Sequence, residues 1–457
     1  MESMNGKRIM VAGLARSGIA AAQLLCGRGA VVTVHDSKTR EQLGEALAPL
    51  ENLPVVWRLA CDPVDVLPGQ ELLVISPGIP SDVPWILKAR EMGIPVIGEL
   101  ELGYQLCPAE MVAVTGTNGK TTTVTLLGEI FANTGRATQT VGNIGFPYTQ
   151  AAMTAKPEDM MVCECSSFQM ETIETFHPRA AAFLNLTEDH LNRHGTMAEY
   201  ARLKMRVFEN QTPEDTAVFN ADDPALEPLI PKVRSRVMLF SRKREVAQGA
   251  FVRDGNVVVR WEGKEEEILP AREIYIPGPH NLENALAAVC VAWAMGVPGD
   301  VIARTLREFK GVEHRIELTR KLDGVSWYND SKGTNVDSTI RAVQTMTRPT
   351  VIILGGSDKH CDFTPLAKEM LASPWMREAV LIGVTADQIE RTLRECGWTA
   401  IHRAGSMREA VELCRSIAQP GWNALLSPAC ASFDMFHDYE ERGRVFKQLV
   451  AELGERA

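Results

Sequence analysis

Residues 111–122 read MVAVTGTNGKTT, and this stretch decides the class of fold. An apolar, strand-like run leads into a glycine-rich loop, and a helix is predicted over 120–133. In this context the loop N–H groups and the helix N-terminus cradle phosphates. Lys120 is expected to reach the β- and γ-phosphates and the Thr121 hydroxyl to bind Mg²⁺. The common GxxxxGK[ST] spacing fails, because Val114 stands where its first glycine belongs, and a shorter GxxGKT loop replaces it.

Strand-like and helix-like runs alternate on both sides of this loop, which predicts parallel sheets with right-handed crossovers. We divide the chain into three blocks, 1–98, 99–311 and 312–457. The predicted strands are 8–12, 31–35, 72–76, 96–97, 111–115, 161–164, 181–184, 217–220, 325–329, 350–354, 380–382 and 424–427, with a hairpin at 251–261. The other predicted helices are 17–28 (capped by Ser17), 281–295, 300–309 and 439–453. The acidic run 262–267 and the basic run 242–244 are expected on solvated loops.

Composition narrows the class of protein. The 457 residues are 45% hydrophobic and 23% charged, which is typical of a globular chain of about three domains. The net charge of −10 argues against a non-specific binder of nucleic acid or of anionic membranes. The longest apolar run, 285–297, is too short to span a bilayer, and no signal peptide is recognisable. The 10 cysteines form no CxxC pair, so we expect reduced thiols and a cytoplasmic location.

A second glycine-rich loop, Gly13-Leu14-Ala15-Arg16-Ser17-Gly18, follows the first predicted strand. It resembles GxGxxG, and Asp36 ends the next strand where a ribose-binding acid would stand. Ala15 replaces the middle glycine that a dinucleotide needs for close approach. The loop therefore favours a nucleotide-diphosphate site that is not specific for NAD, while a plain structural turn stays open.

Polar residues follow other predicted strands of the middle block. Glu164 ends a strand in a sheet that carries a phosphate loop, a position suited to holding Mg²⁺, although it could instead pair with a surface cation. His190 closes the segment NLTEDH after another strand, and a structural histidine is the alternative there. Taken alone, Lys204 is interpreted as an exposed lysine on a helix, and Asn284 as part of a helix start.

Three loops of the last block point to one crevice, because each follows a predicted strand. They are NDSKGTN (329–335), GGSDK (355–359) and SPACAS (427–432). Ordinary turns remain the alternative for each loop taken singly.

Together these motifs resemble the Mur ligase family, the ATP-dependent amide-forming enzymes of peptidoglycan synthesis. The matching segments are GTNGKTT, GNIG (142–145), ECSSFQ, LTEDH, GPHNLENALAA, EHRIE (313–317), NDSKGTN, LGGSDK and LSPACASFD. They extend from about residue 10 to 440, so the resemblance covers nearly the whole chain. The SPGIP turn of the first block and the SPACASFD segment narrow it to the D-glutamate-adding branch.

The resemblance implies an α/β fold of three domains. These are a Rossmann-like N-terminal domain (1–98) for the UDP group, a central P-loop ATPase domain (99–311) with a mostly parallel sheet, and a Rossmann-like C-terminal domain (312–457) for the amino acid. It also implies a reaction in which D-glutamate is added to UDP-N-acetylmuramoyl-L-alanine through an acyl phosphate, giving ADP and phosphate. A cytoplasmic monomer with no nucleic-acid or membrane partner is expected.

The same resemblance assigns roles residue by residue. The catalytic set is Lys120, Glu164, His190 and Lys204. ATP would be bound by Gly116, Thr117, Asn118, Gly119, Lys120, Thr121, Thr122, Asn284, Arg315, Asp330 and Lys332. The UDP-substrate would be bound by Ser17, Asp36, Ser37, Gly78, Asn143 and His190, and D-glutamate by Thr334, Lys359, Ser432, Phe433 and Tyr439. Thr121, Glu164, His190 and Lys204 would hold two Mg²⁺ ions, with Lys204 present as a carbamate, an anion where free lysine is a cation. Arg16 and Lys38 receive no role.

Three alternatives stay open. A folylpolyglutamate-type ligase should lack a separate N-terminal UDP domain. A nicotinamide oxidoreductase fused to a phosphate-loop domain is disfavoured by Ala15. A nucleotide-binding module without turnover would not need Lys120, Glu164, His190 and Lys204 together.

Overall fold

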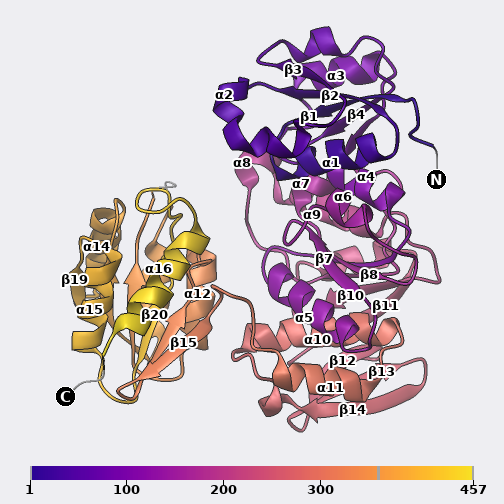
Figure 1. Ribbon diagram of the computed structural model, residues 1–457. Helices are drawn as coiled ribbons and strands as arrows, with labels where there is room; N and C mark the ends of the chain where they lie inside the picture. Colours follow the sequence, from indigo (N-terminus) through magenta and orange to yellow (C-terminus); the bar gives the residue numbers. More distant parts are fainter. Residues whose placement is uncertain (1–2, 358–360, 455–457) are drawn as a thin grey trace. The chain divides into compact units, whose positions relative to one another are not determined.

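The computed structural model describes residues 3–357 and 361–454, whose elements form three β-sheets accompanied by helices (Figure 1). The chain divides into two compact units. The first unit is Met1–Ile274 with Glu283–Glu308, and the second unit is Tyr275–Leu282 with Phe309–Ala457. The predicted α/β class with mostly parallel sheets is confirmed. Among the described residues, no helix combines the length and apolar character that crossing a bilayer requires.

The first unit begins with a fully parallel sheet in the order β3-β2-β1-β4-β5. Its strands are β1 (Arg8–Ala12), β2 (Val31–Asp36), β3 (Val55–Leu59), β4 (Leu72–Ile75) and β5 (Val96–Gly98). The unpredicted β3 lies at the sheet edge and has no fully buried residue. The strand order changes direction between β1 and β4, and the loops after these two strands lie at the C-terminal edge of the sheet, where sheets of this kind bind ligands.

Short helices connect these strands. They are α1 (Arg16–Gly27), α2 (Arg40–Leu43), α3 (Pro84–Glu91) and α4 (Glu99–Leu106), with the 3-10 helices η1 (Gly44–Leu50) and η2 (Pro63–Val66). The prediction that Ser17 caps α1 is wrong, because the helix begins at Arg16 and its N-cap Ala15 makes no side-chain bond. A Cβ atom on Gly18 would lie 1.8 Å from the carbonyl oxygen of Gly13, so this tight turn requires glycine.

The second sheet of the first unit has the order β14-β13-β12-β11-β10-β9-β6-β8-β7. Its strands are β6 (Glu110–Thr115), β7 (Thr138–Gly142), β8 (Met160–Glu164), β9 (Ala180–Phe183), β10 (Thr216–Asn220), β11 (Arg236–Ser241), β12 (Gly249–Arg253), β13 (Asn256–Trp261) and β14 (Lys264–Pro270). Pairing is parallel from β7 to β12 and antiparallel from β12 to β14, which confirms the predicted hairpin. Strands β7, β11 and β14 were not predicted.

The acidic run 262–267 is not the solvated loop that was expected. Its last four residues begin β14, where Lys264 to Glu267 are exposed. Glu265 forms ion pairs with Arg260 on β13 and Arg253 on β12. Cross-strand charge pairing therefore accommodates an acidic segment in a strand.

Helices of this second sheet are α5 (Lys120–Ala132), α6 (Tyr148–Ala152), α7 (Ser167–Met170), α8 (Leu191–His194), α9 (Met197–Met205), α10 (Pro279–Ala294) and α11 (Gly299–Glu308). The 3-10 helices are η3 (Arg206–Phe208), η4 (Glu227–Lys232) and η5 (Ala271–Glu273). The apolar run 285–292 lies within α10 and is buried throughout, as its composition predicted.

Two buried carboxylates on α4 join the two sheets of the first unit. Glu99 accepts hydrogen bonds from the backbone N–H and the hydroxyl of Thr149, each at 2.7 Å. Glu101 accepts them from the backbone N–H (2.7 Å) and the hydroxyl (2.6 Å) of Thr175 and from the backbone N–H of Phe176 (3.1 Å). Helix α4 directly follows β5, so these bonds tie the end of the first sheet to loops of the second.

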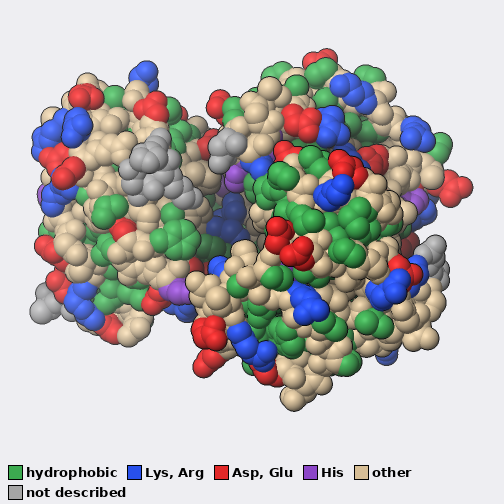
Figure 2. All heavy atoms as spheres, turned by 90° about the horizontal axis from the view of Figure 1, so that it is seen from above, with side chains coloured by type: hydrophobic (Ala, Val, Ile, Leu, Met, Phe, Trp, Pro, Cys, Tyr) green, Lys and Arg blue, Asp and Glu red, His purple; other side chains and the backbone are tan. Residues whose placement is uncertain are grey.

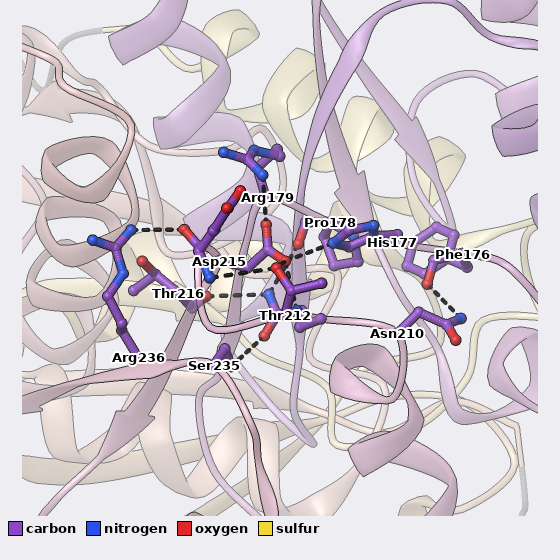
Figure 3. Close-up of polar contacts among 12 residues, drawn as sticks. Phe176, His177, Pro178, Arg179, Asn210, Thr212, Asp215, Thr216, Ser235 and Arg236 are labelled. Carbon is purple, nitrogen blue, oxygen red and sulfur yellow. Dashed lines mark hydrogen bonds and ion pairs between the residues drawn. The ribbon is translucent and has the colours of Figure 1, made fainter.

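A charged cluster lies where strands β9, β10 and β11 begin (Figure 3). The buried carboxylate of Asp215 lies 2.6 Å from His177 Nε2 and 2.9 Å from Arg179 Nη1, and it accepts the backbone N–H of Thr212 at 2.7 Å. Burial alone would raise the pKa of Asp215, but the bonds from His177 and Thr212 outweigh it and lower that pKa. This end of the sheet is opposite the strand ends that lead into the candidate site.

The second unit contains one sheet in the order β15-β16-β20-β17-β18-β19, antiparallel only between β15 and β16. Its strands are β15 (Glu317–Leu322), β16 (Val325–Asn329), β17 (Thr350–Leu354), β18 (Met376–Leu381), β19 (Ile401–Arg403) and β20 (Asn423–Leu426). Its helices are α12 (Val336–Thr345), α13 (Thr364–Ala372), α14 (Ala386–Glu395), α15 (Met407–Ile417) and α16 (Tyr439–Glu452). Two buried apolar clusters use alternate residues of the central strands, so the sheet is covered on both faces.

Charged side chains of both signs are interspersed on the face shown in Figure 2. The blue basic and red acidic groups on the outer surface there do not gather into one extended patch.

The Asp215 cluster generates a stability prediction. Asp215→Asn should lower the free energy of unfolding at pH 7 by about 2–3 kcal/mol, because it leaves His177 and Arg179 without their anion. The native pKa is depressed, so the contribution of Asp215 is fully present above its unfolded pKa of about 3.9 and is lost as the pH falls through the native value. Urea unfolding from pH 7 to pH 3 measures both effects. Glu214→Gln, at the exposed neighbour, is the control, and equal urea midpoints for the two variants would contradict the assignment.

Candidate active site

The glycine-rich loop between β6 and α5 is held against the segment that follows β9. The backbone N–H of Thr117 donates to the carbonyl of Asn185 at 3.0 Å, and the N–H of Asn118 donates to the Asn185 side chain at 2.8 Å. Gly116 and Gly119 have φ of 145° and 85°, a region that favours glycine. The strand, loop and helix therefore form the phosphate-binding arrangement that the sequence predicted.

Two lysines share one carbonyl oxygen in this loop. Lys120 Nζ donates to Gly116 O and Thr117 O, and Lys204 Nζ donates to the same Gly116 O, all at 2.8 Å. Lys204 is 1% exposed, and its Nζ lies 4.5 Å from the ring centre of Tyr200. Burial, reinforced by the nearby Lys120, holds the pKa of Lys204 well below its usual value. This shift favours the neutral amine over the ammonium form.

The interpretation of Lys204 as an exposed lysine, made from its local sequence alone, is therefore wrong. Tyr200 and Lys204 are four residues apart on α9, so they lie on one helix face, and that face is buried. The spacing was visible in the sequence, but which face is buried depends on tertiary packing.

Thr121, Asn143 and Glu164 are brought together. Glu164, at the end of β8, is buried and accepts the Thr121 hydroxyl at 2.9 Å and the Asn143 amide at 2.8 Å. A buried carboxylate beside a hydroxyl provides the hard oxygen donors that Mg²⁺ prefers. These residues fit a magnesium ion.

His190 lies at the start of α8 in the left-handed region, with φ of 55°. Its Nε2 is 3.5 Å from Asp189, and its ring centre is 4.9 Å from that of Phe168. Phe168 belongs to the segment that follows Glu164, so the ECSSFQ and LTEDH motifs meet at this point.

Asn284 on α10 lies beside the phosphate loop, since a Cβ atom on Gly119 would be 2.2 Å from its Oδ1. Helix α10 begins at Pro279, so Asn284 is not at its start and the helix-start alternative is wrong.

Thr122 buries its hydroxyl oxygen with no hydrogen-bond partner in the described part of the chain. An unsatisfied polar atom in the first turn after the loop fits a polar ligand.

The first sheet brings three loops to its C-terminal edge. Asp36 accepts the backbone N–H of Leu14 at 2.8 Å, and the Ser76 hydroxyl donates to Gly13 O at 2.8 Å. Four of the six predicted UDP-substrate residues lie on these loops or beside them: Ser17 in the first turn of α1, Asp36 at the end of β2, Ser37 directly after it, and Gly78 after β4. The other two, Asn143 and His190, follow strands β7 and β9 of the second sheet. Arg16, which had no predicted role, donates to Gly145 O at 2.9 Å and so contacts the loop that carries Asn143.

In the second unit, Asp330 is buried between polar groups. It accepts the Ser427 hydroxyl at 2.6 Å and the backbone N–H of Ile316 at 3.2 Å. Burial raises the pKa of Asp330 to about 7, against the opposing influence of Ser427 and Arg315. Within the described residues, Arg315 Nε is buried without a partner, and the residues on both sides of Arg315 have positive φ. Strain and an unsatisfied donor at one position are typical of a ligand site.

Sequence reasoning missed Arg442 on α16. Its guanidinium is buried and donates to the hydroxyl (2.9 Å) and carbonyl (2.7 Å) of Ser331 and to the carbonyls of Cys430 (3.1 Å) and Ala431 (3.2 Å). Burial lowers the pKa of Arg442 to about 10. It ties the loop after β16 to the loop after β20, which the sequence placed at one crevice. No local pattern distinguishes this arginine from its exposed neighbours.

The remaining predicted residues occupy the same edge of the second unit. Lys332 Nζ lies 5.4 Å from the Tyr439 ring centre, which brings one ATP-site residue near one D-glutamate-site residue. Thr334 lies in the loop after β16, Ser432 is buried in the loop after β20, and Phe433 is 74% exposed. Lys359 lies outside the described residues. The predicted ATP residues are thus divided, with 116–122 and Asn284 in the first unit and Arg315, Asp330 and Lys332 in the second.

Three family models match successive parts of the chain. They are the Mur ligase MurD-like N-terminal domain (residues 7–98), the Mur ligase middle domain (114–292) and the Mur ligase glutamate ligase domain (314–430). A relative from Thermoanaerobacter sp. (strain X514), named UDP-N-acetylmuramoylalanine--D-glutamate ligase, is 45% identical over 452 residues, covering 98% of this chain and 99% of that protein.

The chain belongs to the Mur ligase family. A relative of the same name from Clostridioides difficile (strain 630) is 41% identical over 98% of this chain and 99% of its own length. Among solved structures, UDP-N-acetylmuramate-alanine ligase MurC from Thermotoga maritima has a TM-score of 0.60 at 19% identity and covers 97% of this chain and 99% of that one. The MurF ligase of Thermotoga maritima in complex with ADP has a TM-score of 0.60 at 16% identity, covering 99% of this chain and 96% of that one. At these identities the two structures establish only a shared fold.

The loop geometry of this Mur ligase generates a second prediction. Lys120→Ala should reduce ATP-dependent ADP formation at least 100-fold, because it removes the cation expected to meet the transferring phosphoryl group. UDP binding by calorimetry should change less than twofold, since the candidate UDP loops belong to the other sheet of the first unit. Lys232→Ala, at an exposed lysine of the same unit, serves as the control. Near-parental turnover of Lys120→Ala would reject the assignment.

Proposed function

We propose that this chain is an ATP-dependent amide ligase that joins D-glutamate to UDP-N-acetylmuramoyl-L-alanine and releases ADP and phosphate. The observation that carries the proposal is 45% identity, over nearly the full length of both chains, to relatives named for this reaction. The phosphate loop with Lys120, Thr121 and Glu164 supplies matching chemistry. The reaction belongs to peptidoglycan precursor synthesis, which makes the cell wall.

The chemistry begins with a carboxylate, which is a poor acyl donor because oxide would have to leave. A carboxylate oxygen of the UDP-substrate attacks the γ-phosphorus of ATP, the bond to the β-phosphate oxygen breaks, and ADP leaves. The amine of D-glutamate then attacks the acyl carbon, gives up a proton and expels phosphate. Lys120 is positioned to neutralise charge on the phosphates, and the loop N–H groups orient them.

Magnesium fits the first unit, where we propose that Thr121, Glu164 and His190 help to hold two ions. When bound, Mg²⁺ stabilises negative charge on the phosphate oxygens. The chain's own contribution is orientation, because Thr121 and Asn143 fix the two oxygens of Glu164. Arg315 and Asp330 are proposed to meet phosphate and ribose, and Asn284 to meet adenine.

Lys204 is proposed to carry a carbamate. A neutral amine is required, because only its lone pair can attack CO₂ and form the N–C bond, with loss of one proton. Burial and Lys120 both favour that neutral form. The product places an anion where free lysine is a cation, and an anionic oxygen is a suitable ligand for Mg²⁺.

The remaining roles are proposed from the resemblance. Ser17, Asp36, Ser37, Gly78 and Asn143 would bind the UDP-substrate, and Thr334, Lys359, Ser432, Phe433 and Tyr439 would bind D-glutamate. A monomer acting in the cytoplasm, and the block limits 1–98, 99–311 and 312–457, are also proposals. The folylpolyglutamate ligase, the nicotinamide oxidoreductase and the binding module are not favoured, since the N-terminal match is to a Mur ligase domain and the relatives are named as ligases.

Substrate choice tests the proposed function. Phosphate release should require UDP-N-acetylmuramoyl-L-alanine together with D-glutamate, and L-glutamate should give less than 1% of the D-isomer rate. The chiral centre fixes both carboxylates relative to the attacking amine, so the L-isomer cannot satisfy the same contacts. Coupled ADP and phosphate assays on the purified chain measure this selectivity. Equal rates with D- and L-glutamate, or turnover with a folate, would contradict the proposed function and indicate a ligase of the same family with another substrate.

Lys204 provides a separate test. Lys204→Ala should lose at least 100-fold in kcat yet remain folded, because it removes a buried amine whose charged form is costly. Formate or acetate should partly restore turnover by supplying carboxylate oxygens. Lys204→Arg should stay inactive, since guanidinium remains protonated and does not take up CO₂. Full activity of Lys204→Arg in the same assay would exclude a required carbamate.

A further inference from the structure

A second histidine, His194, lies close to Lys204 without belonging to any predicted site. It is the last residue of α8 and is buried. Gly195 and Thr196 follow, and Thr196 caps α9 by accepting the N–H of Glu199. His194 therefore occupies the corner where the chain turns from the LTEDH segment into the helix that carries Lys204.

The contacts of His194 form a continuous chain that ends at Lys204. Its Nε2 lies 2.9 Å from the Ser167 hydroxyl, in the segment after Glu164. Its ring stacks on Tyr200, with centres 5.3 Å apart and planes at 22°. Lys204 Nζ in turn lies over the Tyr200 ring at 4.5 Å. All four side chains are buried, so each restricts the rotamers of the next.

Lys204 Nζ needs this restraint to stay beside Gly116. It makes only one described hydrogen bond, to Gly116 O, and Lys120 donates to the same oxygen. The ammonium form of Lys204 would be repelled by Lys120, and the neutral form is held by this one hydrogen bond, so the bond to Gly116 alone does not fix the Lys204 side chain. A fixed aromatic ring attracts any remaining cationic form and limits the positions available to the neutral form.

We propose that Ser167 and His194 are a positioning pair, which holds Tyr200 in place and through it fixes Lys204 Nζ beside Gly116. Neither residue takes part in the chemistry. The pair acts on the same reaction as the proposed function and rests on it. The hydrogen bond orients the histidine ring, and the ring face orients the tyrosine.

The test compares three variants with the parent. Ser167→Ala removes only the hydrogen bond, His194→Phe keeps the ring without that bond, and His194→Ala removes both. We expect kcat to fall about 5-fold in the first two and at least 30-fold in the third, with KM for ATP and for the UDP-substrate within twofold of the parent. The ¹³C NMR signal of a lysine carbamate, formed by the substrate-free protein in ¹³C-bicarbonate, should weaken in the same order.

A matched control is His177→Ala. His177 is also hydrogen-bonded through Nε2, but to Asp215 at the opposite end of the strands (Figure 3). It should lower the thermal midpoint at least as much as His194→Ala while keeping the parental kcat and carbamate signal. A folded His194→Ala variant with parental kcat would overturn the proposed positioning role of Ser167 and His194. An equal loss of kcat in the His177→Ala control would overturn it as well.

Failure of the proposed function is recognised separately. A parent chain that makes no ADP with D-glutamate and the UDP-substrate contradicts the function, and the carbamate signal of the free protein then decides the positioning pair alone. An active parent without a carbamate signal contradicts the carbamate, and kcat with the two KM values then decides the pair. A parent lacking both activity and signal overturns the pair together with the function.

Discussion

The carbonyl oxygen of Gly116 is the point on which the candidate active site depends. It accepts hydrogen bonds from Lys120 and Lys204, two side chains that reach it from different helices. Burial, and after it the charge of Lys120, lowers the pKa of Lys204. The lowered pKa favours the neutral form of Lys204 that the proposed carbamate requires, beside a second lysine that is proposed to meet phosphate. Gly116 has a φ of 145°, in the region that favours glycine, so the backbone that presents this carbonyl depends on the glycine.

The second unit also buries ionisable side chains, in this case one acid and one base. Asp330 and Arg442 are both buried, and each is surrounded mainly by neutral hydrogen-bonding groups, from Ser427 and Ile316 or from Ser331, Cys430 and Ala431. The pKa of each moves toward the neutral form. A buried charge is costly unless its hydrogen-bonding partners stay in place. The hydrogen bonds of Asp330 and Arg442 therefore favour one arrangement of the loops after β16 and β20.

Local sequence was sufficient for the phosphate loop and its flanking elements, because strand, glycine turn and helix start are encoded within about a dozen residues. It was sufficient for most strands with buried apolar runs, such as β6 and β17. It failed where the decisive information is tertiary. The first four residues of β14 are exposed and mostly acidic, and this half of the strand is recognisable only beside its arginine-bearing neighbours. Lys204 and Arg442 have unremarkable local sequences, and their burial depends on which helix face meets the sheet.

The resemblance to a known family supplied a prediction that local patterns could not, namely that Lys204 acts together with Glu164 and His190. It did not provide the contacts of His194, because these arise from the corner between two short helices. Geometry brings Thr121, Asn143 and Glu164 together in the first unit, and it places Lys332 beside Tyr439 in the second.

Strand β14 has a consequence for how the protein behaves at high concentration. It is the outermost strand of the nine-stranded sheet, and an outermost strand offers unpaired backbone groups to any other chain. The glutamates at 265–267 charge this border, so two copies that approached edge to edge would bring like charges together. The acidic run thus disfavours pairing between the edge strands of two copies. Replacing it with apolar residues of high β-propensity would create an edge that promotes intermolecular β-sheet formation and aggregation.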